Sequence, residues 1–171
     1  MMTFMIYALI WERYGFSYQG AATAIYILVF GYIAILDLYT QSIPNYLSFP
    51  AIAIGLSLGA FWPGSDLVEA ATGALTGFGV MLFIWVAPRM SIGAGDVKLA
   101  AGIGAINGFP LILFGLLTAF FCVGITAIII LSARVLRRSD NMAFAPFLVL
   151  GGLAALLWGD SISTWYLDRL G

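Results

Sequence analysis

Residues 111–133 read LILFGLLTAFFCVGITAIIILSA, a stretch of 23 residues without one charged side chain. As a helix this stretch is about 34 Å long, which is enough to cross the hydrocarbon layer of a bilayer. The rest of the chain has the same character, since 63% of its 171 residues are hydrophobic and only 9% are charged. Soluble domains carry about 25% charged residues. The expected surroundings of this chain are therefore a lipid bilayer.

Five further apolar stretches accompany this one, at Tyr18–Leu36, Tyr46–Trp62, Leu67–Ala87, Val97–Asn107 and Ala143–Trp158. A span needs about 17–25 residues, so the first and third of these fit, those at 46–62 and 143–158 are marginal, and that at 97–107 is short. All six prolines lie at or near the proposed boundaries. The sequence predicts an all-α, polytopic membrane protein, a bundle of about six transmembrane helices. Residues 1–171 form one domain, with 1–17 as an interfacial segment.

The basic residues predict the orientation of this bundle. With the amino terminus outside, the inner loops carry five basic residues, namely Arg89, Lys98, Arg134, Arg137 and Arg138. Only Arg13 and Arg169 then remain outside. This distribution satisfies the positive-inside rule and places both termini outside.

The composition also excludes several chemistries. The chain has no histidine and a single cysteine, Cys122, so it has no Ser-His or Cys-His catalysis and no internal disulfide. A structural zinc site is not expected, nor is any other metal or cofactor. The net charge is −1 and the basic residues are scattered, so no nucleic-acid partner is expected. Any catalysis must use carboxylates, Lys98, hydroxyls or the backbone.

Two aspartates stand at the ends of proposed helices. Asp37 follows an uncharged run, and Asp96 opens the short fourth helix, 59 positions later. Two spans lie between them, so both carboxylates return to the same membrane face. Two carboxylates in one site do not readily ionise together. The ionised partner can then take a proton from water while the protonated partner polarises a peptide carbonyl. We therefore predict Asp37 and Asp96 as a catalytic pair.

The residues around each aspartate form distinctive motifs. Gly93-Ala94-Gly95-Asp96 places two glycines before a helix, where they allow the close approach of another backbone, such as a substrate strand. The alternative is an ordinary helix entry with Asp96 as its N-cap. Asp37 is followed by Ile43-Pro44-Asn45, and Asp96 by Val97-Lys98-Leu99.

Together these motifs resemble those of the prepilin peptidase family, the G-x-G-D aspartyl peptidases of bacterial and archaeal membranes. Phe144-Ala145-Pro146-Phe147-Leu148 is similar to a third element of that family. The resemblance implies that Asp37 and Asp96 cleave a short basic leader from prepilin-like precursors at the cytoplasmic face of the inner (cytoplasmic) membrane. The candidate substrate-binding residues are Gly93, Gly95, Lys98, Pro44 and Asn45.

Two features depart from the larger members of that family. Paired C-x-x-C motifs and the associated methyltransferase region are missing, so the chain resembles the short, peptidase-only members. Tyr39 stands where the family often has a basic residue. The resemblance indicates no oligomeric state.

Other functions are compatible with parts of this pattern. A small transporter or channel subunit could use Asp37 and Asp96 as proton or cation ligands, although the two halves show no inverted repeat. A catalytically silent assembly factor and a Ser-Lys peptidase using Ser91 and Lys98 are further alternatives. Lys98 itself could reach the membrane interface, contact an acidic substrate residue or tune Asp96.

Overall fold

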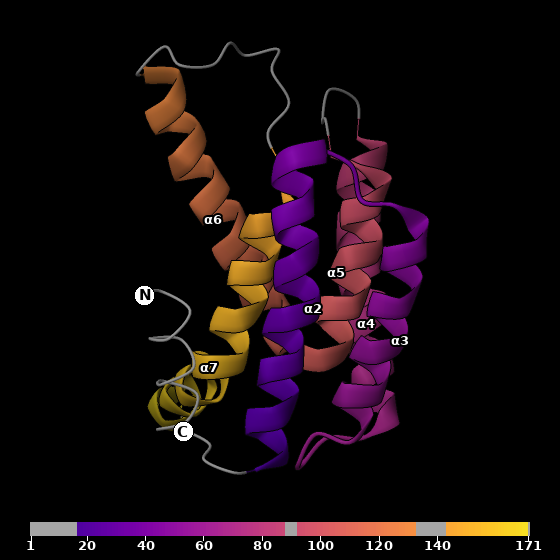
Figure 1. Ribbon diagram of the computed structural model, residues 1–171. Coiled ribbons are helices and arrows are strands. Elements are labelled where there is room, and N and C mark those ends of the chain that lie inside the picture. The colour runs from indigo at the N-terminus through magenta and orange to yellow at the C-terminus, as the bar shows by residue number, and fades with distance from the viewer. Residues whose placement is uncertain (1–16, 88–91, 133–142, 171) are drawn as a thin grey trace.

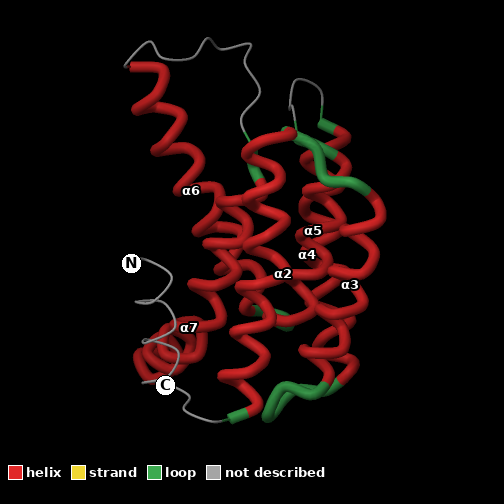
Figure 2. The backbone as a smooth tube through the Cα atoms, viewed as in Figure 1, coloured by secondary structure: helices red, strands yellow, loops and turns green. Residues whose placement is uncertain are grey.

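The computed structural model describes residues 17–87, 92–132 and 143–170, which form six helices and no strand. Figure 1 shows them as an elongated bundle, and Figure 2 shows most of the loops at its two ends. The helices are α2 (Tyr18–Thr40), α3 (Asn45–Ala60), α4 (Leu67–Val86), α5 (Ala94–Asn107), α6 (Leu111–Ser132) and α7 (Ala145–Leu170). The predicted all-α class is therefore confirmed.

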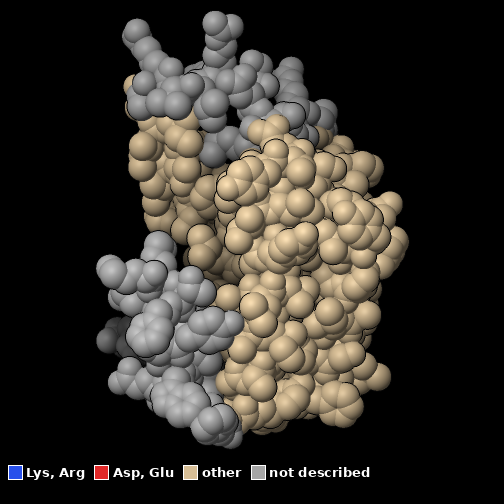
Figure 3. All heavy atoms as spheres, viewed as in Figure 1, with Lys and Arg blue, Asp and Glu red and all other residues tan. Residues whose placement is uncertain are grey.

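Three of these helices are long and apolar enough to cross a membrane: Tyr18–Thr40, Leu67–Val86 and Leu111–Ile130. They correspond to the three stretches whose length fits a span. The face of the molecule in Figure 3 shows no charged side chain among the described residues. Many large apolar side chains are exposed, as a surface in contact with lipid tails requires.

Several helix ends differ from the predicted boundaries, and two of these differences affect the site. Helix α2 continues past Leu36 to Thr40, so Asp37 lies in its last turn. Helix α5 begins at Ala94, so Asp96 is its third residue and not its N-cap. Pro50 lies inside α3 and not at a boundary. The end of α7 at Leu170 also lies beyond the predicted Trp158. The predicted interfacial segment lies almost entirely outside the described residues.

Helix α5 is the centre of the bundle, and small residues allow it to be there. Its backbone lies close to the backbones of both α3 and α4. A Cβ atom added to Gly55 of α3 would collide with the carbonyl oxygen of Gly102, and one added to Gly77 of α4 would collide with that of Ala100. Every residue of α5 from Asp96 to Asn107 is buried except Lys98. Glycines on α3 and α4 therefore let both helices approach α5 closely.

Helices α2 and α7 are held together by a buried hydrogen bond. The hydroxyl of Tyr26 donates to the carbonyl oxygen of Val149 at 2.9 Å, and the Tyr26 ring stacks on Phe30 with centroids 4.8 Å apart. The Tyr26 hydroxyl also occupies the space above Gly152 that a Cβ would fill. These contacts hold α2 against the first turns of α7.

Candidate active site

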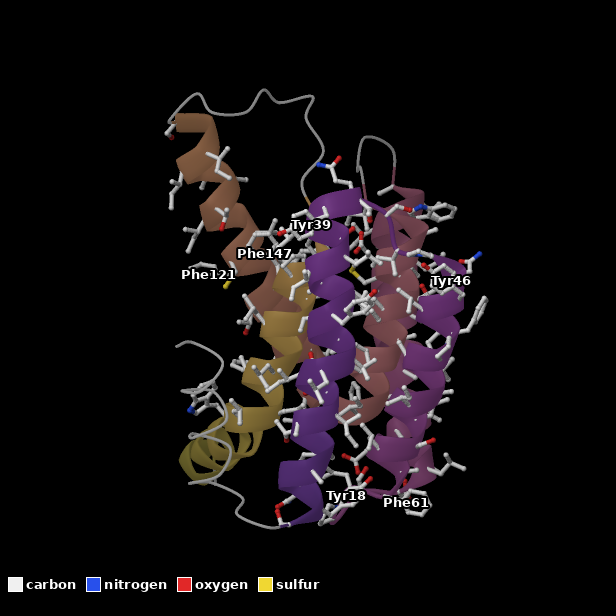
Figure 4. All side chains as sticks on the ribbon, viewed as in Figure 1. Tyr18, Tyr39, Tyr46, Phe61, Phe121 and Phe147 are labelled. Carbon is white, nitrogen blue, oxygen red and sulfur yellow. The ribbon has the colours of Figure 1, made fainter. Side chains whose placement is uncertain are left out.

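A cavity of about 480 Å³ lies at one end of the bundle. The last turn of α2, the start of α3 and the start of α5 meet there, together with Ala143 and Phe144 before α7. Figure 4 labels Tyr39 and Tyr46 at this end, and Tyr18 and Phe61 at the opposite end. The lining residues are Asp37, Gln41, Ser42, Ile43, Asn45, Ile92, Gly93, Ala94, Gly95, Asp96, Lys98, Ala143 and Phe144.

Asp37 reaches this cavity from α2 and is anchored to α7. Its side chain is only 5% exposed. The backbone N–H of Ala145, the first residue of α7, donates to Asp37 Oδ2 at 3.2 Å. The first N–H groups of a helix have no acceptor within the helix, so the carboxylate satisfies one of them. This bond fixes the direction of the Asp37 side chain.

Asp96 reaches the cavity from the first turn of α5. Its side chain is 7% exposed. Its Oδ2 accepts a hydrogen bond from the backbone N–H of Gly93 at 3.1 Å, so the carboxylate caps its own helix from the third position. Its Oδ1 is buried and has no hydrogen-bond partner among the described residues. An unpaired buried carboxylate oxygen is costly, which is typical of a functional group.

The cavity brings the two predicted aspartates together. Both carboxylates line it, and they interact electrostatically. Lys98 is the one basic residue among the described lining residues. Two buried acidic groups so placed disfavour each other's ionisation. Such a pair can act as base and acid at once.

Gly95 allows a loop to lie directly on the start of α5. A Cβ on Gly95 would lie 2.7 Å from the Cβ of Ile43 and 3.2 Å from its carbonyl oxygen. The loop that carries Ile43 therefore passes over the residue before Asp96, where the glycine was predicted to admit a substrate backbone. Any other residue type at position 95 would displace this wall of the cavity.

Lys98 contacts α3 from the rim of the cavity. Its Nζ donates to Asn45 Oδ1 at 2.5 Å and lies 5.0 Å from the ring centroid of Phe49. Of the five predicted substrate-binding residues, Gly93, Gly95, Asn45 and Lys98 line the cavity. Pro44 does not line it but is the N-cap of α3. Ser91 of the alternative Ser-Lys pair lies outside the described residues.

Several lining residues were not assigned by sequence reasoning. Phe144 belongs to the third motif, residues 144–148. The sequence did not show that Phe144 lines the same cavity as Asp37 and Asp96. Gln41 adopts a left-handed conformation with φ of +50° and ends α2. No signal in the sequence marked Gln41, because the predicted helix ended at Leu36. In the described part of the chain, no group of three or more His, Cys, Asp or Glu side chains could hold a metal ion.

Comparison with known proteins gives consistent matches. The sequence model of the Type IV leader peptidase family matches residues 24–128. The chain is 30% identical over 163 residues to the prepilin leader peptidase/N-methyltransferase of Stutzerimonas stutzeri, covering 91% of this chain and 56% of that protein. It is 31% identical over 166 residues to that of Pseudomonas aeruginosa, covering 93% and 57%.

The protein of the same name from Bacillus subtilis is 29% identical over 176 aligned positions, which cover 98% of this chain and 67% of that protein. The chain thus spans just over half the length of the first two relatives. No solved structure gives a significant match.

Proposed function

The chain belongs to the type IV leader peptidase family, and from this premise we propose that it is an aspartyl endopeptidase that removes the leader from prepilin-like precursors. The cleavage takes place at the cytoplasmic face of the inner membrane. One observation carries the proposal: two buried carboxylates, from helices far apart in sequence, line a single cavity at one end of the bundle.

The proposed reaction uses the shared proton of Asp37 and Asp96. The ionised carboxylate takes a proton from a water molecule, whose oxygen attacks the carbonyl carbon of the scissile bond. The protonated carboxyl group gives its proton to the carbonyl oxygen. The tetrahedral intermediate then collapses. One of its hydroxyl groups returns its proton to the carboxylate that acted as the acid, the C–N bond breaks, and the leaving nitrogen takes up the proton that came from water. The pair is left with one proton, ready for a second cycle.

The position of the cavity supports a substrate that crosses the membrane. Asp37 lies at one end of α2, a helix that is long enough to span a bilayer, and Asp96 lies in the first turn of the shorter α5 at the same end of the bundle. A scissile bond just outside the transmembrane segment of a precursor would lie at the same depth. A transporter would instead need polar groups near the middle of the bilayer. The two buried carboxylates do not provide such a path, so we favour the peptidase.

The test is co-expression of the chain with a cognate precursor in a host that lacks other such peptidases. Intact-mass measurement should find the precursor shortened by its leader. An unshortened precursor beside folded enzyme would contradict the peptidase.

A further inference from the structure

We propose that Lys98 is a positioning residue: through Asn45 it holds the loop of residues 42–45 against the start of α5, and it does not bind substrate. This loop, here called the Ile43 wall, forms one side of the cavity. Figure 2 shows the connection from α2 to α3 in green, at the end of the bundle where α5 begins. Only the kinetic test of this inference rests on the proposed function.

The Lys98 ammonium group is engaged by two side chains of α3. Asn45 is the first residue of α3, and Phe49 follows one turn later on the same face. The amide oxygen of Asn45 accepts a hydrogen bond from Nζ at 2.5 Å, and the Phe49 ring lies under the charge at 5.0 Å. A cation that lies over an aromatic ring and also donates a hydrogen bond to an amide is held in one orientation. Lys98 therefore points to α3.

The two contacts between the Ile43 wall and α5 lie on one face of the helix. Gly95 and Lys98 are three positions apart, so they are neighbours on the helix surface. Ile43 is buried against Gly95, and Asn45 is bonded to Lys98. The wall is thus held at two adjacent points on α5, and Asp96 directly follows the first of them. Its position sets the space available beside the Asp96 carboxylate.

The contact with Lys98 is the more easily broken of the two. The hydrogen bond is exposed, whereas Ile43 is held by packing. At its other end the wall follows Gln41, whose left-handed conformation is unfavourable for a residue with a side chain. Without the Asn45 bond, the wall keeps the packing of Ile43 on Gly95 and the bond from the Thr40 hydroxyl to the Ser42 carbonyl oxygen, but it loses its second contact with α5. We therefore expect loss of this bond to widen the cavity and to misplace a bound peptide.

The first test measures the wall itself and needs no substrate. Ile43→Cys is introduced into a Cys122→Ser chain, and its rate of modification by a maleimide is measured on the purified protein in detergent. The thiol should react slowly, because position 43 is buried. Lys98→Met and Asn45→Ala should each raise the rate several-fold, and Asn45→Asp, which keeps an acceptor for Nζ, should not. Equal rates in all four proteins would overturn the proposal.

The second test is a double-mutant cycle on cleavage. Lys98→Met and Asn45→Ala should each lower kcat/KM by about tenfold through kcat, since misplacement at a reacting centre costs rate. The double variant should lose the same tenfold and not a hundredfold, because both changes break one contact. Multiplicative losses with a raised KM for Lys98→Met would mean that Lys98 binds substrate. If no protein cleaves, the proposed function fails while the maleimide result still decides the role of Lys98.

Discussion

Asp37 accepts a hydrogen bond from the backbone N–H of Ala145 across 108 positions of the chain. The bond joins the last turn of one helix to the first turn of another. Asp96 is held in the same manner by the N–H of Gly93. Each carboxylate therefore has one oxygen committed to a helix end, and the side-chain direction is set before any substrate binds.

This arrangement makes asparagine a clean probe of the proposed catalytic pair. The amide oxygen of Asn can accept the same N–H bond at either position, so Asp37→Asn and Asp96→Asn should fold and insert normally. Both should abolish cleavage of a purified precursor, because neither can share a proton with its partner. Asp37→Glu should retain only a trace, since a displacement of about 1 Å can cost ~10²-fold in rate. Near-normal turnover by either Asn variant would rule out the aspartyl mechanism.

The shared proton also predicts a bell-shaped pH profile of kcat/KM. At low pH the pair binds a second proton and the base is lost, so the rate falls. At high pH the shared proton is lost and no acid remains, so the rate falls again. Initial rates of precursor cleavage across the pH range check this. A rate that rises to a plateau at high pH would show that no acid is needed.

Gly95→Ala should disturb the cavity without unfolding the protein. The added Cβ would lie 2.7 Å from the Cβ of Ile43, so the Ile43 wall must shift. We expect a loss of activity of about 10²-fold, as for other small misplacements at a reacting centre. Gly31→Ala is the matched control, because a Cβ at Gly31 of α2 meets nothing within 4 Å. Equal activity of the two variants would contradict this account of Gly95.

Gly77→Ala should destabilise the bundle. Its Cβ would collide with the carbonyl oxygen of Ala100 in α5, and overpacking of this kind costs about 1–3 kcal/mol. Gly79→Ala in the same helix has nothing within 4 Å and should be neutral or slightly stabilising. Thermal unfolding in detergent distinguishes the two. If Gly77→Ala melted at the temperature of Gly79→Ala, α4 and α5 would not pack as described.

The orientation predicted from the basic residues can be tested at both ends of the bundle. Gln41 lies at the proposed inner end and Gly64 at the proposed outer end, but both have a positive φ that residues other than glycine rarely adopt. The neighbouring Ser42→Cys and Ser65→Cys are better choices in a Cys122→Ser background. An impermeant thiol reagent applied to intact cells should label position 65 and not position 42. The reverse pattern would invert the topology.

The sequence by itself determined the helical class and the three stretches long enough to span a membrane. It also singled out the two aspartates that line the cavity. Each of these depends on local composition or on a short motif, which is readable along the chain. The ends of the helices were harder to predict. Gln41 ends α2 and Gly93 precedes α5 through backbone conformations and hydrogen bonds that residue type does not dictate.

Only the tertiary structure decided what each site residue contacts. Ala145 bonds to Asp37 across 108 positions and Lys98 to Asn45 across 53. Such contacts depend on how α2, α3 and α7 are arranged around α5. That arrangement depends in turn on how closely glycine residues let neighbouring helices approach one another. Helix packing distances are set by pairs of facing residues, so no single stretch of sequence specifies them.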